Sequence, residues 1–269
     1  IIPYLSEKES STVDELVSEY DGRLDVLEKK LRAIRILDPA CGSGAFLIKA
    51  AETLMGIDEA IQKNKQTGAT QKTMHEYQYE KEISKIIANS IFGVDMNEES
   101  VEIAKLSIFL KISGGDRKLV DLSNNIRVGN SLIDFDWEAE FSEKFDIVIG
   151  NPPYGAKLTE SHKEYLKNKY KLGTTDTAAL FMELAKKVLS ENGWHGFIIP
   201  KPFLYASNWQ ILREHFLDHI ISIIDCGRPW KEVKLEQIIY IFSSNLQQDF
   251  YNNGTRKGGI LKHEIKIKK

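Results

Sequence analysis

The sequence predicts an α/β fold, in which helices flank a buried open sheet. Short β-branched runs alternate with segments of helical periodicity. A glycine-rich turn joins an early strand to a helix, and a Pro-Pro pair ends a later apolar run. The chain has 269 residues, of which 42% are hydrophobic, which is enough to bury one large core.

The first predicted strand, Ala33–Leu37, leads through Asp38–Gly44 into a helix that opens with Ala45–Ala51. A glycine turn in this position is where a cofactor approaches the backbone. A dinucleotide fingerprint would need a third glycine where Leu47 stands, so a pyrophosphate site is disfavoured. Cys41 has no nearby histidine to activate it, and we expect it to be a small filler.

The second predicted strand, 90–94, ends at Asp95, and a helix begins around Asn97. An acid in this place can hold ribose hydroxyls. Asp95 can equally cap the helix, with Glu98 in the capping-box position, and the two roles are compatible. A largely helical stretch, 56–89, separates this strand from the glycine turn.

The third predicted strand, 125–128, runs into Gly129-Asn130-Ser131-Leu132. Asn130 offers a donor and an acceptor, which suits the edge of an adenine ring. Gly-Asn and Asn-Ser are also common turn signals, so the residues alone leave both interpretations open.

A fourth strand, Phe145–Gly150, ends in Asn151-Pro152-Pro153-Tyr154. Two prolines remove two N–H donors, so the carbonyls of this segment are free to accept from a ligand. The Asn151 side-chain oxygen beside a rigid carbonyl makes a pair of acceptors for one –NH2 group, and Tyr154 offers a flat face. The segment predicts a site for a planar amine, in preference to a simple turn.

The later elements continue the alternation. We expect a helix from Thr177 that ends at Asn192-Gly193, a strand at 196–199, a helix at 206–219, and strands at 219–225 and 237–242.

Four segments in order, DPACGSGAFL, IFGVDMNEESVEIAKLSIFL, IRVGNSL and FDIVIGNPPYG, resemble the DNA methyltransferases that modify adenine N6, in particular the Eco57I-like restriction-modification group. The resemblance covers residues 34–242, and the order of motifs is that of the gamma class. It implies a Rossmann-like fold with a seven-stranded, mostly parallel sheet, helices on both faces and a reversed last strand. It also implies S-adenosylmethionine as cofactor, double-stranded DNA as partner and a cytoplasmic, prokaryotic location.

The resemblance also implies roles for single residues. The cofactor site would comprise Asp38, Ala40, Gly42 and Gly44 at the methionine part, Asp95 at the ribose, Asn130 at the adenine, and Met96. Asn151 and the Pro152 carbonyl would accept the N6 hydrogens of a flipped adenine that stacks on Tyr154. Trp230 is either a second stacking face or part of a loop packed on the sheet. This mechanism needs neither a metal nor a protein nucleophile.

The chain departs from the family in two places. Many relatives carry Asp where Asn130 stands, and the usual Tyr-Thr-Pro-like segment does not occur before Ile34. We therefore expect a helical lead-in at 1–32, a catalytic domain at 33–245 and a tail or truncated linker at 246–269. Any nuclease and the DNA-recognition domain would lie outside this chain.

Charge is distributed unevenly along the chain. Residues up to Gly155 include 18 basic and 27 acidic side chains, whereas the remainder has 18 and 12. A DNA-facing surface is thus expected around 157–171 and in the basic tail, although solvated lysines would give the same pattern. The sequence has no apolar run of membrane-spanning length and no signal peptide, and its two cysteines exclude a disulfide scaffold.

Two alternatives stay open at this stage. One is a methyltransferase of the same type that acts on a protein glutamine or on RNA, since a carboxamide is also a planar amine. The other is an inactive subunit that binds DNA. Asp225 with Glu232-Val233-Lys234 matches a nuclease pattern, but these residues fall within the predicted sheet, and we expect no nuclease here.

Overall fold

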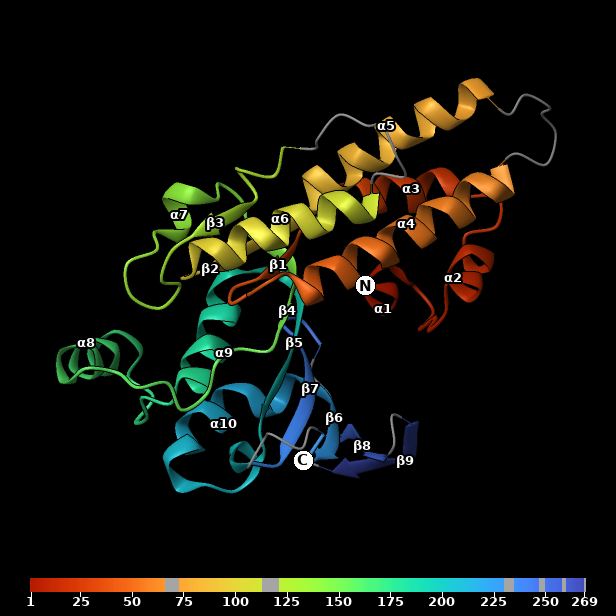
Figure 1. Cartoon of the computed structure of the whole chain (residues 1–269). Helices are drawn as coiled ribbons and strands as arrows, with labels where there is room; N and C mark the ends of the chain where they lie inside the picture. Colours follow the sequence, from red (N-terminus) through yellow and green to blue (C-terminus); the bar gives the residue numbers. More distant parts are fainter. Residues whose placement is uncertain (66–72, 113–120, 230–234, 247–249, 258–259, 269) are drawn as a thin grey trace. The chain divides into compact units, whose positions relative to one another are not determined.

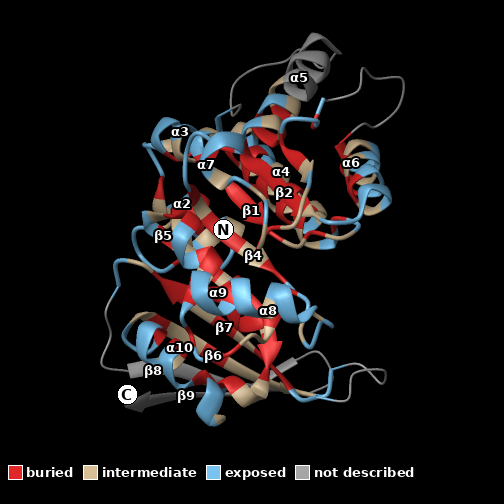
Figure 2. Ribbon diagram, turned by 90° about the vertical axis from the view of Figure 1, so that its left-hand side faces the viewer, coloured by how far each residue is buried: buried red, intermediate tan, exposed pale blue. Residues whose placement is uncertain are grey.

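The chain forms two units in the computed structural model, Ile1–Val128 and Gly129–Lys269 (Figure 1). The structure describes residues 1–65, 73–112, 121–229, 235–246, 250–257 and 260–268. Figure 2 shows buried residues gathered on the strands of each unit and on the inner faces of helices such as α4 and α9.

The first unit contains three parallel strands in the order β3-β2-β1. Their bounds are β1 Ile36–Asp38, β2 Ile91–Asp95 and β3 Ile126–Val128. All three residues of β1 and the first four of β2 are buried, which explains why both read as continuous apolar runs in the sequence. The carboxyl ends of these strands share one edge of the sheet.

Two long helices pack on these strands. Helix α4 (Ala45–Lys65) contacts β1 and β2, and α6 (Glu98–Ile112) contacts β2 and β3. Three helices precede β1, namely α1 (Ile2–Leu5), α2 (Val13–Glu19) and α3 (Leu24–Ala33). They lie in the region for which the sequence predicts a helical lead-in, and Leu16, Leu27 and Leu31 are fully buried.

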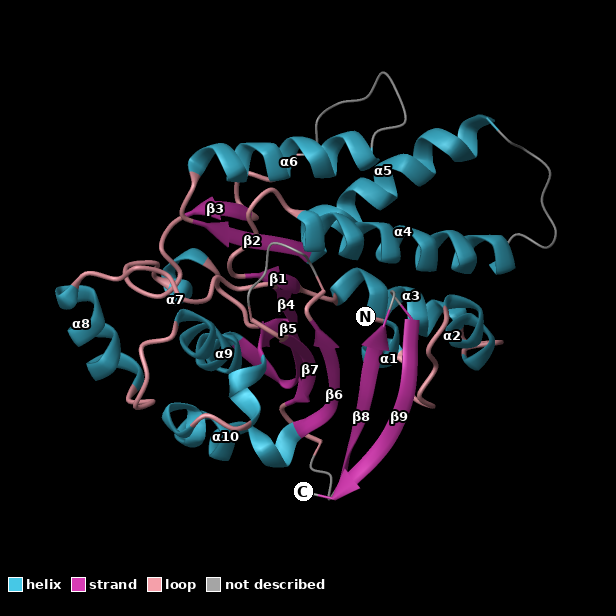
Figure 3. Cartoon of the chain, turned by 60° about the horizontal axis from the view of Figure 1, so that its bottom comes forward, coloured by secondary structure: helices cyan, strands magenta, loops and turns pink. Residues whose placement is uncertain are grey.

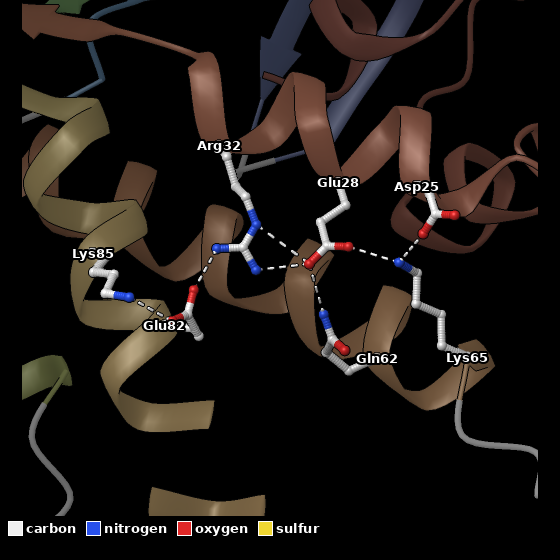
Figure 4. A network of polar contacts seen from close by, with 7 residues as sticks. All are labelled: Asp25, Glu28, Arg32, Gln62, Lys65, Glu82 and Lys85. Atoms are coloured by element: carbon white, nitrogen blue, oxygen red, sulfur yellow. Dashed lines mark hydrogen bonds and ion pairs between the residues drawn. The ribbon is translucent and has the colours of Figure 1, made fainter. Parts of the chain in front are cut away.

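In the described residues, the predicted helical insertion at 56–89 comprises the second half of α4 and nearly all of α5 (Thr73–Ser90). A polar network ties it to α3 (Figure 4). Glu28 accepts hydrogen bonds from Arg32 (2.7 Å) and Lys65 (2.6 Å), and Arg32 also donates to Glu82 on α5 (2.9 Å). The network fixes the inserted helices against the lead-in helix, so the stretched spacing between β1 and β2 leaves the order of strands intact.

The second unit has a mixed sheet in the order β4-β5-β7-β6-β8-β9. Strand β4 (Phe145–Gly150) is parallel to β5 (Leu189–Pro200), and β7 (Gln237–Ser243) is antiparallel to both β5 and β6 (Ile220–Gly227). The reversed strand that the family resemblance implies is therefore confirmed as β7.

Four α-helices and three short 3₁₀ helices accompany these strands within the described residues. Helix α7 (Trp137–Glu140) precedes β4, and α8 (Glu160–Tyr170) and α9 (Thr177–Val188) lie between β4 and β5 in the chain. After β5 come η1 (Lys201–Leu204), η2 (Ser207–Trp209), α10 (Gln210–Phe216) and η3 (Leu217–His219).

The structure differs from the predicted elements at four places. Asn97, and not Asp95, caps α6 by accepting from the Ser100 N–H at 2.9 Å. Strand β5 begins directly after α9, so Asn192-Gly193 lies inside a strand. The single helix expected at 206–219 is divided into η2, α10 and η3. Residues 246–269, expected as a tail, contain β8 (Phe250–Lys257) and β9 (Ile260–Lys268) (Figure 3).

Each of the first two differences is caused by a contact with a segment distant in the sequence. Asn97 is a stronger N-cap than Asp95 here because the Asp95 carboxylate is already engaged with the glycine turn. Asn192-Gly193 lies between Leu189 and Trp194, where the register with β4 is irregular, and the strand continues beyond this signal because Trp194 to Pro200 are all paired with β7.

None of the helices in the described part of the chain is long and apolar enough to span a membrane.

An aromatic cluster forms the core of the second unit around a buried histidine. His195 on β5 is 1% exposed, and its ring lies within about 6 Å of the rings of four aromatic residues. The neighbours are Phe197, Phe216, Tyr240 and Phe242. The Tyr240 hydroxyl and His195 Nδ1 are hydrogen-bonded at 2.9 Å. Burial, with a smaller contribution from the charge of Lys186, lowers the pKa of His195 to about 3.

This pKa predicts that acid destabilises the protein through His195. The unfolded chain binds a proton at His195 below about pH 6.5, whereas the folded chain does so only near pH 3. The free energy of unfolding should therefore fall between these values as the pH is lowered, by up to about 1.4 kcal/mol per pH unit from this group. Urea unfolding from pH 7 to pH 4 should show a shallower pH dependence for His195→Gln than for the wild type. The exposed His162→Gln variant is the matched control, and an equal slope in His195→Gln would contradict the assignment.

Candidate functional site

The glycine turn of the first unit leaves β1 at a buried carboxyl group. Asp38 is 1% exposed, and its Oδ1 accepts a hydrogen bond from the Ala40 N–H at 3.1 Å. The Cys41 N–H donates to the Val94 carbonyl at 3.0 Å, which joins the turn to β2. Cys41 is buried and its burial raises the thiol pKa, in agreement with the predicted filler role.

Two glycines allow the chain to pass from β1 into α4. Gly42 has φ +50° and Gly44 has φ +86°, in the left-handed region that side chains avoid. At Gly44 a Cβ atom would also lie 2.9 Å from Cβ of Ala104 on α6, whereas at Gly42 it would meet open space. Gly44 is thus required by helix packing, while Gly42 leaves the turn open to an approaching ligand.

Asp95 holds this turn from the end of β2. Its Oδ2 accepts from the Gly42 N–H at 2.8 Å, and its Oδ1 accepts from the Asn97 N–H at 3.0 Å. A carboxylate has about four lone pairs, so two acceptor positions remain for the hydroxyls of a ligand. The structural role and the predicted ribose-binding role of Asp95 are therefore compatible.

The electrostatics of the turn suit a positively charged ligand. Burial, together with the nearby charge of Asp95, raises the pKa of Asp38 to about 7. A cation placed beside this carboxyl would favour its charged form and would gain attraction in return. A cofactor that carries an ammonium and a sulfonium group meets this requirement, so the residues present fit S-adenosylmethionine.

The remaining predicted cofactor residues are more accessible. Met96 is 69% exposed directly after β2, at the same edge as the glycine turn. Asn130 belongs to the second unit, where its Oδ1 accepts from the Leu132 N–H at 3.2 Å and its carbonyl accepts from Ile133 and Phe135. Asn130 thus makes the turn that its sequence also suggests, and its contact with a cofactor stays a prediction.

The Asn151–Tyr154 segment follows β4 in the second unit. Asn151 is exposed at the carboxyl end of the strand, Pro152 is buried and Tyr154 is half-buried. Gly155 then adopts φ +64° in open space and turns the chain toward α8. The Asn151 side chain is therefore accessible at the edge where ligands bind in α/β sheets.

Thr177, the first residue of α9, anchors this segment. Its Oγ1 donates to the Pro153 carbonyl at 2.5 Å, and the residue is 3% exposed. Asp176 caps the same helix by accepting from the Ala178 N–H at 3.0 Å. Thr177 was not predicted as a site residue, because Asp-Thr before an apolar helix indicates only a helix start.

The remaining predictions concern the stacking residue Trp230, the nuclease-like pattern and a metal site. Trp230, and Glu232-Val233-Lys234 of the nuclease pattern, lie outside the described residues. Asp225 is ion-paired with Lys201 at 2.7 Å, and Lys201 also pairs with Glu236 at 2.9 Å. In the described ranges, no three of His, Cys, Asp and Glu gather into a potential metal site.

The basic segment 157–171 is largely helix α8, and most of its lysines are exposed. Lys163 pairs with Glu160 at 2.8 Å, and Lys169 donates to the Leu132 carbonyl at 2.9 Å. Local contacts therefore account for these two lysines, whereas Lys157, Lys167 and Lys171 extend from the surface.

The chain is similar to known proteins in sequence and in fold. The model of the family described as Eco57I restriction-modification methylase matches residues 89–229, just over half of the chain. The chain is 30% identical over 211 residues to the type II restriction enzyme and methyltransferase RM.Eco57I of Escherichia coli, a match that covers 67% of this chain and 21% of that protein. It is 24% identical over 209 residues to the type II methyltransferase M.VspI of Vibrio sp. (strain 343), covering 77% and 41% respectively. The chain thus spans less than half the length of either relative.

The fold also resembles that of a solved restriction-modification enzyme. The type IIL enzyme MmeI, in complex with DNA, matches with a TM-score of 0.69 and 20% identity over 95% of this chain and 38% of that chain. At this identity the match concerns the fold alone, and it confirms the predicted Rossmann-like methyltransferase fold.

Proposed function

Because this chain belongs to the Eco57I restriction-modification methylase family, we propose that it contains the catalytic core of a methyltransferase that modifies N6 of adenine in double-stranded DNA. The observation that carries the proposal is the exposed Asn151 at the end of β4, followed by prolines whose carbonyls have no backbone rival. S-adenosylmethionine supplies an electrophilic methyl group when it is bound.

The first unit supplies all of the proposed cofactor contacts except Asn130. Asp38, Ala40, Gly42 and Gly44 would hold the methionine part, and the two free acceptor positions of Asp95 would take the ribose hydroxyls. Met96, with its exposed side chain at the same edge, would lie against the cofactor. Asn130 keeps its proposed adenine contact through its side-chain amide.

The Asn151–Tyr154 segment would orient the target amine. Asn151 Oδ1 and the Pro152 carbonyl would accept the two N6 hydrogens, and the nitrogen lone pair would then point toward the methyl donor. Both acceptors stabilise the positive charge that develops on N6, and the proton is lost afterwards. The Pro153 carbonyl is already used by Thr177, which leaves the Pro152 carbonyl as the second acceptor.

A stacked and paired adenine must leave the duplex to reach these groups. Flipping costs roughly a few kcal/mol, and stacking on Tyr154 would return about 1–3 kcal/mol. Lys157, Lys167 and Lys171 are exposed in the segment that follows Tyr154, and they would neutralise DNA phosphates.

The proposal is tested by the DNA of a host that lacks adenine methylation. DNA from cells that express the full-length protein should yield N6-methyladenine on digestion, and sequencing should place the modified base within one recurring recognition sequence. Asn151→Ala should lower the methylation rate on the order of 100-fold or more, because an acceptor for the developing charge is lost. Asn64→Ala, an exposed asparagine on α4, is the matched control. Methyl label found only on protein or RNA, or full activity of Asn151→Ala, would overturn the proposal.

A second prediction concerns Thr177 as a positioning residue. Thr177→Val keeps the shape of the side chain but removes the hydrogen bond to the Pro153 carbonyl. The Pro152 carbonyl, the proposed second acceptor, then loses its fixed orientation. We expect kcat for DNA to fall about tenfold, as for a lost hydrogen bond of about 1–1.5 kcal/mol, with the KM for the cofactor unchanged. Thr177→Ser should restore kcat to within about twofold. Equal kcat values for the Val and Ser variants would show that the hydroxyl does not position the segment.

A further inference from the structure

The loop that follows β5 exposes two large apolar side chains. We call residues 201–206 the edge loop. Leu204 is 38% exposed and Tyr205 is 69% exposed, whereas Phe203 before them is 2% exposed and packs against Trp209 and Tyr240. Tyr205 is therefore largely accessible and Leu204 partly so.

The edge loop is held firmly on both sides of these residues. Arg213 Nη1 on α10 donates to the Phe203 carbonyl at 2.9 Å and to the Ala206 carbonyl at 2.7 Å. The Pro202 carbonyl accepts from the Tyr205 N–H (3.1 Å) and the Ala206 N–H (2.8 Å). The two exposed side chains therefore project from a backbone that is fixed before and after them, which is a costly way to present apolar surface unless it has a partner.

The edge loop lies at the edge of the sheet that carries Asn151. Strand β5 is parallel to its neighbour β4, with Phe197 opposite Gly150, so both strands end at the same edge. Leu235, just before β7, is 47% exposed, and the adjacent Glu236 carbonyl accepts from the Lys201 N–H at 2.9 Å. Three exposed apolar side chains thus gather at this edge, with the exposed Arg228 following β6.

We propose that Leu204 and Tyr205 form a wedge that packs against the base faces uncovered in DNA when the target adenine leaves the stack. The proposal rests on the adenine methyltransferase function proposed above. Removing one base from a duplex uncovers the flat, apolar faces of its two neighbours. Aromatic and apolar side chains are those that proteins insert between bases. Arg228 at the same edge provides a positive charge for the adjoining phosphates. Apolar side chains beside a cation are what DNA binding requires, whereas an apolar protein partner would not require the cation.

The wedge can be tested on DNA duplexes that contain the recognition sequence identified by sequencing the methylated DNA. Tyr205→Ala should lower kcat/KM on the matched duplex by on the order of tenfold, because stacking on the open helix is lost. On a duplex with a flat aromatic surrogate such as pyrene opposite the target adenine, Tyr205→Ala should come within about threefold of the wild type, since the surrogate itself fills the gap and stacks on the neighbouring bases. Tyr205→Phe keeps the aromatic face and should match the wild type on both duplexes.

The control is Leu217→Ala, which removes an apolar side chain about as exposed as Leu204, before β6 at the opposite edge of the sheet. It should leave both rates unchanged. Full activity of Tyr205→Ala on the matched duplex would overturn the wedge, and so would an equal loss on both duplexes, which would indicate that Tyr205 supports the protein's own structure. Absence of N6-methyladenine with the wild-type protein would instead overturn the proposed function.

Discussion

The cofactor half of the candidate site depends on one carboxylate. Asp95 ends β2, yet it accepts hydrogen bonds from Gly42, in the turn after β1, and from Asn97, at the start of α6. A single side chain thereby fixes the turn, the end of a second strand and the entry of a second helix. The Cys41 N–H bond to Val94 also joins the turn to β2, but it is the Asp95 carboxylate that binds the left-handed Gly42.

In the second unit, the hydroxyl of Thr177 fixes the segment that follows β4. Two prolines leave the segment after β4 without N–H donors, so a partner from elsewhere must fix its carbonyls. Thr177 does so for Pro153, and it lies at the start of a helix in which nine of twelve residues are buried. In both units the candidate residues lie at the carboxyl ends of parallel strands and are positioned by the helix or turn that follows.

Local patterns predicted β1, β2, β4 and β7 well because most residues of these strands are buried. The apolar runs at 91–94 and 145–150 are strands, and the reversed strand β7 lies at the predicted residues. Patterns failed where a distant partner decides the outcome. Gly42 engages the carboxylate of Asp95 from 53 residues away, so Asn97 becomes the cap of α6, and pairing with β7 extends β5 through an Asn-Gly signal. For the same reason neither Thr177 nor the exposed pair Leu204 and Tyr205 was recognisable before the loops had been placed.

The most direct test of this account is calorimetric titration of S-adenosylmethionine into the wild type, Asp95→Ala and Asn151→Ala proteins, with melting temperatures measured beside it. If Asp95 both holds the turn and binds the ribose, Asp95→Ala should lose cofactor binding while Asn151→Ala binds within a few-fold of the wild type. Wild-type affinity in a folded Asp95→Ala protein, or loss of binding in Asn151→Ala, would contradict the account.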